Sequence, residues 1–365
     1  MNETVRLRAL RASMANDGVE ALLVTHLPDV RWLCGFTGSN AALVVTEKKA
    51  VLFTDGRYTV QAKEETRGAR VVIAKKSALK EACALLESSM GAGAKRASYD
   101  PEHTTVAALA MMRSAVGGKV RRSFFVSQER PLVAELRMVK DAAELRLMEK
   151  AAALGDRVFD AVLPHIESGV AETEIAASLE FFARSMGAEA MSFETIVASG
   201  ERSALPHGRA SARKTPRNGF VTLDFGVILN GYCSDMTRTV YLGKLSRQER
   251  AAYEAVLEAQ EAGVAAVKPG ATCGEVDEAA RGVLRKAGLA KFFTHSTGHG
   301  VGLEIHESPR LAAGQTMELK PGMVVTIEPG VYLAGKFGIR IEDMVAVTQR
   351  GNKLLTTAPK ALIEL

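Results

Sequence analysis

The chain of 365 residues has only four cysteines, and none of them belongs to a Cys-x-x-Cys pair. Sparse, widely spaced cysteines are typical of free thiols in a reducing compartment and not of a disulfide framework. No apolar run has the length needed to span a membrane, and the charged N-terminus lacks the apolar core of a signal peptide. These absences predict a cytoplasmic protein that has no membrane partner.

A basic stripe is also absent. The 47 lysines and arginines exceed the 42 acidic residues by only five, and they cluster at most in short pairs. This distribution argues against a nucleic-acid partner. An apolar content of 47% and a charged content of 24% are those of an ordinary globular protein. The length predicts two domains, since a single core rarely grows this large.

Helix and strand signals alternate over residues 1–130, which predicts an α/β domain with a mixed sheet. The expected helices cover residues 5–16, 77–90 and 103–115, and the second of them should end at Gly91-Ala92-Gly93. The expected strands cover residues 19–25, 41–45, 50–54, 71–74 and 97–99.

Residues 131–365 have a different pattern. Capping boxes at Asp141/Glu144 and Thr272/Glu275 predict helix starts, and further helices are expected at 172–186 and 247–267. Strands are expected at 195–198, 220–229, 232–242, 323–333 and 338–348. A helix pair followed by an antiparallel strand pair thus occurs twice, which predicts an internally duplicated α+β domain.

A first acidic pair follows from turn chemistry. Asn230-Gly231 is a strong hairpin signal, because both central residues of a type I′ turn need positive φ. Counting outward from this loop places Gly226 opposite Asp235. Asp224 lies two positions from Gly226 and therefore on the same face. The two aspartates are predicted to be diagonal neighbours roughly 7 Å apart, close enough to share a metal ion.

A second acidic pair is formed by Glu328 and Glu342. They lie in strand-like segments joined by a short linker, which predicts another hairpin. Arg340, two residues before Glu342, should share its face and orient its carboxylate. An isolated acid in a strand usually marks an exposed edge, but four acids at paired positions between apolar residues predict a site.

Histidines add nitrogen donors near these acids. His299 lies in the run Ser-Thr-Gly-His-Gly-Val-Gly, with His295 four residues before it and His306 seven after it, and His207 is an ambiguous fourth candidate. Four carboxylates without counter-charge would repel one another. Their oxygens and one imidazole nitrogen suit Mn²⁺, Co²⁺ or Zn²⁺. The sequence therefore predicts two divalent cations and a hydrolase.

The same segments resemble the aminopeptidase P and prolidase family, whose catalytic domain has the pita-bread fold. The resemblance is carried by LDFGVILNGYCSDMTRTV, THSTGHGVGLEIHESPR, VVTIEPGVYL and GIRIEDMVAVT. Nearer the N-terminus, VRWLCGFTGSNAALVV and LFTDGRYTVQA resemble the family's creatinase-type N-terminal domain. The resemblance covers essentially the whole chain and implies a creatinase-like domain at 1–130 and a pita-bread metallopeptidase domain at 131–365.

The resemblance also implies roles for individual residues. Asp224 would bind one metal ion, and His299 with Glu328 the other, while Asp235 and Glu342 bridge the two. Mn²⁺ is the first choice of metal, with Co²⁺ and Zn²⁺ as alternatives. The remaining positions match outer histidines that hold the substrate and the oxyanion, an arginine behind the ligands and a nearby tyrosine: His207, His295, His306, Arg340 and Tyr332.

These roles fit hydrolysis chemistry. Glu328 is the carboxylate expected to take a proton from the attacking water and pass it to the leaving nitrogen. His306, with His295 as a second candidate, would donate to the oxyanion, worth about 3 kcal/mol per donor by analogy with other hydrolases. By resemblance, the bond cut joins a first residue to proline, and the protein is a homodimer. In the family, the N-terminal domain supports dimerisation and closes off the active site. By resemblance, the candidates for contact with the partner subunit or closure of the site are Trp32, Asp55, Arg57 and Tyr58, and the alternative for each is simple packing.

Several functions remain open. The preferred hypothesis is an aminopeptidase P, which acts on longer peptides, and the alternative is an Xaa-Pro dipeptidase, or prolidase. A dipeptidase must bind a carboxylate close to the scissile bond, and Arg310 is the candidate for this. The long N-terminal domain and Arg340 argue against a methionine aminopeptidase. A metal-free creatinase-like or binding relative is disfavoured because no ligand is missing.

Overall fold

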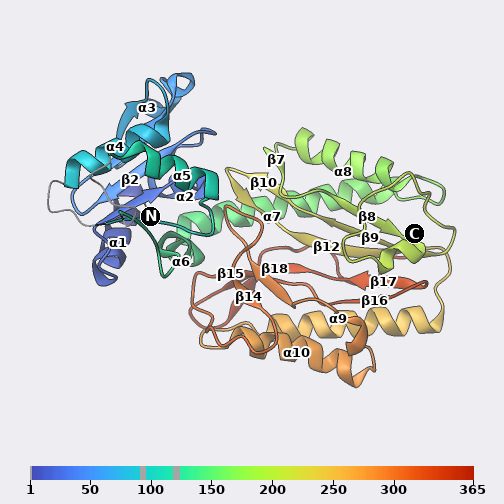
Figure 1. Ribbon diagram of the computed structural model, residues 1–365. Helices are drawn as coiled ribbons and strands as arrows, with labels where there is room; N and C mark the ends of the chain where they lie inside the picture. Colours follow the sequence, from blue (N-terminus) through green and yellow to red (C-terminus); the bar gives the residue numbers. More distant parts are fainter. Residues whose placement is uncertain (1, 91–95, 118–123) are drawn as a thin grey trace. The chain divides into compact units, whose positions relative to one another are not determined.

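The computed structural model describes residues 2–90, 96–117 and 124–365 (Figure 1). The chain forms two compact units, Met1–Arg137 and Met138–Leu365. The domain boundary expected after residue 130 stays a prediction, and the helix end expected at Gly91–Gly93 lies outside the described residues. Within the described part of the chain, every helix is too short or too polar to cross a bilayer.

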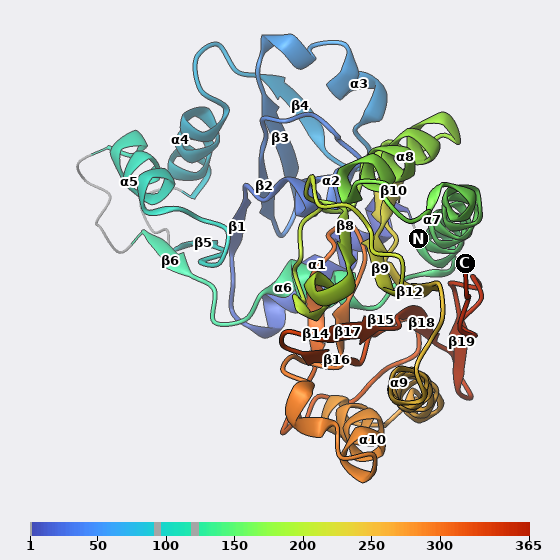
Figure 2. The ribbon, with the colours of Figure 1, turned by 90° about the vertical axis from the view of Figure 1, so that its right-hand side faces the viewer.

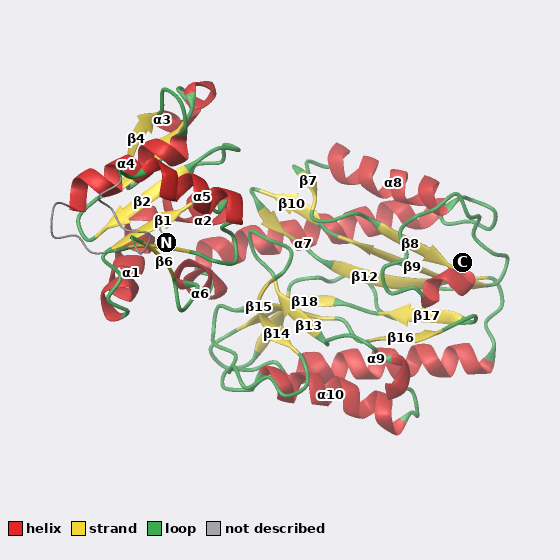
Figure 3. Ribbon diagram, viewed as in Figure 1, coloured by secondary structure: helices red, strands yellow, loops and turns green. Residues whose placement is uncertain are grey.

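The N-terminal unit contains a six-stranded mixed sheet in the order β4-β3-β2-β1-β5-β6. β1 runs antiparallel to β2 but parallel to β5, so the expected mixed α/β sheet is confirmed (Figure 3). The strands are β1 (Ala21–Val24), β2 (Ala42–Thr46), β3 (Ala50–Thr54), β4 (Arg70–Ile73), β5 (Ala97–Tyr99) and β6 (Phe125–Ser127).

Helices cover this sheet. They are α1 (Glu3–Asn16), α2 (Leu27–Cys34), α3 (Gln61–Glu65), α4 (Ala78–Met90), α5 (Val106–Ala115) and α6 (Leu132–Met138). Apolar residues of α4 and α5 pack with alternate residues of β1, β2 and β3 in one core cluster. α2 was not expected, although Pro28 near its start and Gly35 at its end, with φ 83°, are ordinary helix signals. It is too short for its apolar periodicity to stand out.

In the C-terminal unit, two helix pairs lie on opposite sides of the strands, as Figures 1 and 2 both show. One pair is α7 (Ala142–Val162) and α8 (Glu172–Ser185), and the other is α9 (Arg247–Ala266) and α10 (Cys273–Lys286). The capping boxes Asp141/Glu144 and Thr272/Glu275 are both formed, so these two predicted helix starts are confirmed.

The strands between the helix pairs are shorter than expected. Three of the four predicted long strands nearest the site are interrupted at or next to a candidate ligand, and the fourth is interrupted at Gly226. They are β7 (Ala190–Met191), β8 (Ile196–Ser199), β9 (Gly219–Phe225), β10 (Val227–Leu229), β11 (Tyr232–Cys233), β12 (Met236–Leu242), β13 (Gly298–Gly300), β14 (Glu307–Leu311), β15 (Val324–Ile327), β16 (Gly330–Leu333), β17 (Phe337–Arg340), β18 (Asp343–Val347) and β19 (Asn352–Leu354).

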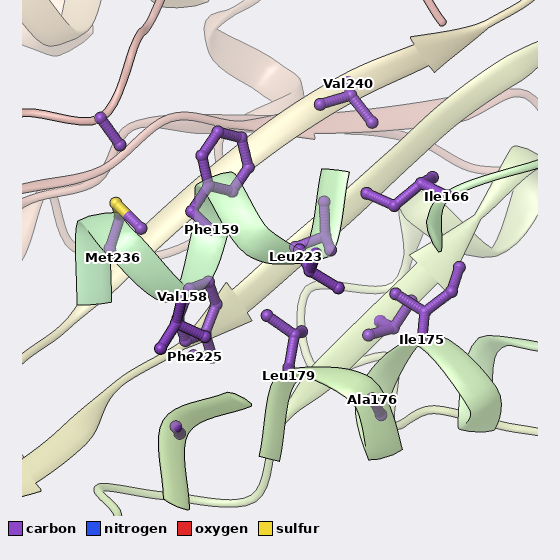
Figure 4. Packing of buried hydrophobic residues seen from close by; sticks show 14 of the residues in the cluster. Val158, Phe159, Ile166, Ile175, Ala176, Leu179, Leu223, Phe225, Met236 and Val240 are labelled. Atoms are coloured by element: carbon purple, nitrogen blue, oxygen red, sulfur yellow. The ribbon is translucent and has the colours of Figure 1, made fainter. Parts of the chain in front are cut away.

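An apolar core holds α7 and α8 against β9 and β12. Phe159 of α7 and Leu179 of α8 pack with Leu223 and Phe225 of β9 and with Met236 of β12 (Figure 4). All five side chains are at most 2% exposed. Burial of such side chains stabilises the fold by about 1.5–3 kcal/mol each. This core holds β9, which contains Asp224, and β12, which begins directly after Asp235.

Candidate metal centre

The hairpin predicted around the two aspartates is confirmed. Asn230 and Gly231 have φ of 50° and 80°, as a type I′ turn requires. β9 and β12 pair with Asp224 directly opposite Thr237, which makes Asp235 its diagonal neighbour. Gly226 is needed between them, because a Cβ there would lie 1.9 Å from the carbonyl oxygen of Ser234.

The two glutamates lie at matching breaks in a second strand pair. Ile327 pairs with Asp343 on one side of the break, and Gly330 pairs with Arg340 on the other. Two residues on each strand separate these pairs, so the register brings Glu328 opposite Glu342. The hairpin expected through this linker is confirmed by the β16–β17 pairing.

His299 presents an unprotonated nitrogen to the acids. Its Nδ1 lies 3.0 Å from the carbonyl oxygen of Gly300, which can only accept a hydrogen bond, so the proton is on Nδ1. Nε2 therefore carries a lone pair, and it lies 3.5 Å from both Asp235 Oδ2 and Glu328 Oε1. One ligand atom each of Asp235, His299 and Glu342 lie within 4.8 Å of one another. Metal-binding histidines usually donate their other ring N–H to a carbonyl or carboxylate oxygen, which fixes the tautomer, as the Gly300 carbonyl does here.

The electrostatics of this group call for a cation. Burial, followed by repulsion from the neighbouring carboxylates, raises the pKa values of Asp235 and Glu342 well above the usual range. Burial also raises the pKa of Glu328 to about 8, despite the opposing charge of Arg340. Burial lowers the pKa of His299 to about 4, so its imidazole is neutral at pH 7. Crowded carboxylates beside a neutral imidazole lone pair are a fitting donor set for divalent cations.

Arg340 contacts a different carboxylate from the one expected. Its Nη2 donates to Asp224 Oδ2 at 2.5 Å, and not to Glu342. Its Nε donates to Thr237 Oγ1, and Thr237 Oγ1 in turn donates to Glu342 Oε2 at 2.7 Å. Thr237 was missed by the sequence analysis, although its place opposite Asp224 in the predicted register would have marked it.

His295 has both ring nitrogens engaged. Nδ1 donates to the carbonyl oxygen of Ser296 at 2.8 Å, so Nε2 accepts from the hydroxyl of Tyr332 at 2.9 Å. The Tyr332 oxygen itself accepts from Arg340 Nη1 at 2.7 Å. Burial lowers the pKa of His295 to about 4, which keeps the ring neutral. In this arrangement Nε2 of His295 has no proton to donate to a substrate oxyanion.

His306, His207 and Arg310 are exposed. The ring of His306 stacks edge-on against His299, with centroids 4.4 Å apart. Arg310 lies in β14, where it pairs directly with His299 of β13. Directly paired residues project from the same face of a sheet. Among the described residues, no carboxylate lies within ion-pair distance of Arg310.

Four further candidates belong to the N-terminal unit. Trp32 is 5% exposed, and the guanidinium of Arg6 lies over its ring at 4.9 Å, which is a packing role. Asp55 and Arg57 form a bidentate ion pair, and Tyr58 bonds to Ser39 on the surface. Their part in contact or closure stays a prediction.

Comparison with known proteins adds independent findings. Residues 146–349 match the model of metallopeptidase family M24, and residues 6–139 match the creatinase/prolidase N-terminal domain. The chain is similar to an Xaa-Pro dipeptidase from Pyrococcus horikoshii, with 33% identity covering 100% of this chain and 99% of the relative. Its structure is similar to that of an Xaa-Pro dipeptidase from Bacillus anthracis, with TM-score 0.94, 38% identity and full coverage of both chains. It is also similar to an X-Pro aminopeptidase from Thermotoga maritima, with TM-score 0.87 and 36% identity over 98% of this chain and 99% of that one.

Proposed function

The chain belongs to metallopeptidase family M24, within the group of aminopeptidase P and the prolidases, and on this premise we propose that it is a two-metal Xaa-Pro dipeptidase. It would hydrolyse the bond between a first residue and a C-terminal proline. The main hypothesis from the sequence was an aminopeptidase P. The comparisons favour the alternative, because dipeptidases are prominent among the similar proteins.

The metal ions would be held by Asp224, Asp235, His299, Glu328 and Glu342. The geometry that supports this is the His299 lone pair facing Asp235 and Glu328, beside carboxylates whose pKa values burial and repulsion have raised. When bound, such ions polarise a carbonyl and lower the pKa of water, so that a strong nucleophile forms at neutral pH.

The chain's own residues then move the proton. Glu328 would accept a proton from the attacking water and deliver it to the prolyl nitrogen as the C–N bond breaks. His306 would donate a hydrogen bond to the carbonyl oxygen as negative charge develops there, worth about 3 kcal/mol. His295 is a poor second donor because its Nε2 accepts from Tyr332. Its role would be to hold Tyr332, and through it Arg340, behind Asp224.

One observation carries the dipeptidase hypothesis. Arg310 is exposed, has no carboxylate partner among the described residues, and shares a sheet face with His299 through direct pairing. A guanidinium in this position would bind the substrate carboxylate with charge-assisted hydrogen bonds. His207 would bind the other part of the substrate. A tripeptide places its carboxylate one residue further away, beyond the reach of the same contact.

The experiment is hydrolysis of Ala-Pro beside Ala-Pro-Ala by Mn²⁺-loaded and EDTA-treated protein. We expect metal-dependent turnover with strong preference for the dipeptide. Preference for the tripeptide would establish an aminopeptidase P instead. If the metal-loaded protein hydrolysed neither Ala-Pro nor Ala-Pro-Ala, the proposed Xaa-Pro specificity would be refuted.

The metal identity, oligomer and location are further proposals. We propose Mn²⁺ as the metal, with Co²⁺ and Zn²⁺ as alternatives, a homodimer, and a cytoplasmic site of action. The match to the creatinase/prolidase N-terminal domain supports the prolidase group over methionine aminopeptidase. Metal analysis of the purified protein would distinguish a metallopeptidase, which should contain bound metal, from a metal-free relative.

A further inference from the structure

His207 lies on a segment that has little regular structure of its own. Residues 199–211, here called the His207 loop, leave the end of β8, form one short 3-10 turn at Gly200–Ala204 and return to the first turn of α8, where the Thr173 amide donates to the Ser211 carbonyl. The tip is closed by single turns, with the Gly208 amide donating to the Leu205 carbonyl at 3.0 Å. An exposed loop of this kind is mobile unless other elements hold it. The position of His207 therefore depends on what anchors the loop.

Both ends of the His207 loop are bound to one carboxylate. Glu172, the first residue of α8, is 0% exposed. Its Oε1 accepts from the backbone amide of Ser199 at 2.8 Å and from the Ser199 hydroxyl at 2.9 Å. Its Oε2 accepts from the backbone amide of Ser211 at 3.2 Å and from the Ser211 hydroxyl at 2.7 Å. One side chain thus closes the base of the loop.

Arg202 compensates the charge of this buried carboxylate from within the loop. Its Nε lies 3.2 Å and 3.0 Å from the two Glu172 oxygens. Its Nη2 donates to the carbonyl oxygen of Arg209 at 2.6 Å, which ties the two limbs of the loop together above the base. A buried carboxylate that accepts from backbone amides, hydroxyls and a guanidinium is satisfied on both oxygens, and such a fully bonded network is rigid.

The tip of the loop is bound to the metal-site arginine. The carbonyl oxygen of Pro206, next to His207, accepts from Arg340 Nη1 at 3.0 Å. The same guanidinium holds Asp224 through Nη2. The hydroxyl of Ser203 also accepts from the Gly338 amide of β17 at 2.8 Å. His207 is therefore placed relative to Asp224 by Arg340 at the tip and Glu172 at the base, with Ser203 as a further contact between them.

We propose that Glu172 is a positioning residue for substrate binding, which acts by holding the His207 loop. This inference rests on the proposed function and deepens it, since it takes His207 as a substrate contact. Glutamine cannot replace Glu172, because each of the two oxygens accepts from a backbone amide and from Arg202 Nε, which have no lone pair, and the amide NH₂ would face such donors in either orientation. Glu172→Gln therefore releases one end of the loop.

The first test is kinetic. We expect Glu172→Gln to raise KM for Ala-Pro about tenfold, the effect of losing one charge-assisted hydrogen bond, while kcat and metal content stay within about twofold. His207→Ala in the Glu172→Gln background should add little to His207→Ala alone, because both changes remove the same contact. Glu174→Gln, an exposed acid in the same first turn of α8, is the matched control and should match wild type.

The second test does not depend on activity. Hydrogen exchange in peptides covering residues 199–211 should be faster in Glu172→Gln than in Glu174→Gln, with exchange elsewhere unchanged. If Glu172→Gln fails to fold, Ser211→Ala can be tested in the same way, because it removes only the hydrogen bond from the Ser211 hydroxyl to Glu172. If wild type fails to cleave Ala-Pro, the proposed function falls while exchange still decides the anchoring. The proposal would be overturned if residues 199–211 exchanged no faster in Glu172→Gln than in Glu174→Gln. It would also be overturned if the KM effects of Glu172→Gln and His207→Ala were additive, or if Glu172→Gln lost both kcat and bound metal.

Discussion

Removal of the metal should make the stability of the C-terminal unit fall as pH rises from 6.5 to 8. Burial raises the pKa of Glu328 to about 8, and burial with carboxylate repulsion raises those of Asp235 and Glu342. The folded apo protein therefore holds protons that the unfolded chain has already released. Stability from such a group is complete below its unfolded pKa and is lost as pH rises through its folded pKa.

The pH window is chosen to exclude the histidines. Burial lowers the pKa values of His295 and His299 to about 4, so these two residues destabilise the fold only when pH falls below about 6.5. Between pH 6.5 and 8 the carboxyl groups dominate. Glu328 alone accounts for roughly 1–2 kcal/mol over this range, since one pKa unit corresponds to about 1.4 kcal/mol. The thermal midpoint should fall by a few degrees.

The assay is calorimetric melting of EDTA-treated protein at the two pH values, and again with Mn²⁺. Metal ions displace protons from their ligands, so the gain in midpoint with Mn²⁺ should be larger at pH 8 than at pH 6.5. Glu342→Gln should flatten the pH slope of the apo protein, whereas Glu254→Gln, an exposed acid on α9, should leave it unchanged. A midpoint that is constant or rises with pH in the apo protein would refute the reasoning.

Three further predictions concern single side chains. Asp235→Asn should abolish turnover yet keep the far-UV circular dichroism of wild type, and residual activity near the wild-type level would rule out the two-metal site. Lys360→Met removes the 2.7 Å ion pair between Lys360 and Asp343. Arg238 and Lys360 lower the pKa of Asp343 despite its burial, so the stability from this pair is lost only as pH falls through the lowered pKa. Urea unfolding should show a loss of about 1–3 kcal/mol at pH 7 that shrinks only below about pH 4, and a loss that disappears between pH 7 and about pH 5 would contradict this. Arg310→Met should raise KM for Ala-Pro at least about tenfold and leave that for Ala-Pro-amide unchanged, and equal effects on the two substrates would show that Arg310 does not bind the carboxylate.

Local chemistry was enough to predict the elements and the pairing around the candidate ligands. The Asn230-Gly231 turn requires positive φ at two positions, and this alone set the register that makes Asp224 and Asp235 diagonal neighbours. The capping boxes at Asp141 and Thr272 were predictable for the same reason, since each involves residues three apart. Such features depend on a few adjacent residues and survive any change of surroundings.

The strand breaks were missed, and one of them had a local signal. The sequence analysis expected one strand through Glu328 and one through Glu342, yet β15–β16 and β17–β18 are separated there. Pro329-Gly330, directly after Glu328, marks the first break, because proline cannot donate to a strand ladder. The second break has no such breaker beside Glu342 and lies opposite the first. The two strand pairs keep equal spacing across the break, so the glutamates still face each other.

The contacts of Arg340 were also decided at long range. Side chains alternate along a strand, which placed Arg340 on the same face as Glu342. Its guanidinium instead binds Asp224, which is 116 residues away in the sequence, and it reaches Glu342 only through Thr237. Side-chain partners across separate strand pairs depend on how those pairs pack, and the pairing register within one hairpin does not specify this.

The sequence by itself determined which residues could hold metal ions, because residue type, turn chemistry and alternation are properties of short segments. Only the tertiary structure decided how those residues are used. It showed that the Gly300 carbonyl fixes the lone pair of His299 on Nε2, that His295 is committed to Tyr332, and that Glu172 closes the loop of His207. Each of these depends on atoms brought together by packing, because a buried donor or acceptor must form its hydrogen bonds with the protein groups around it.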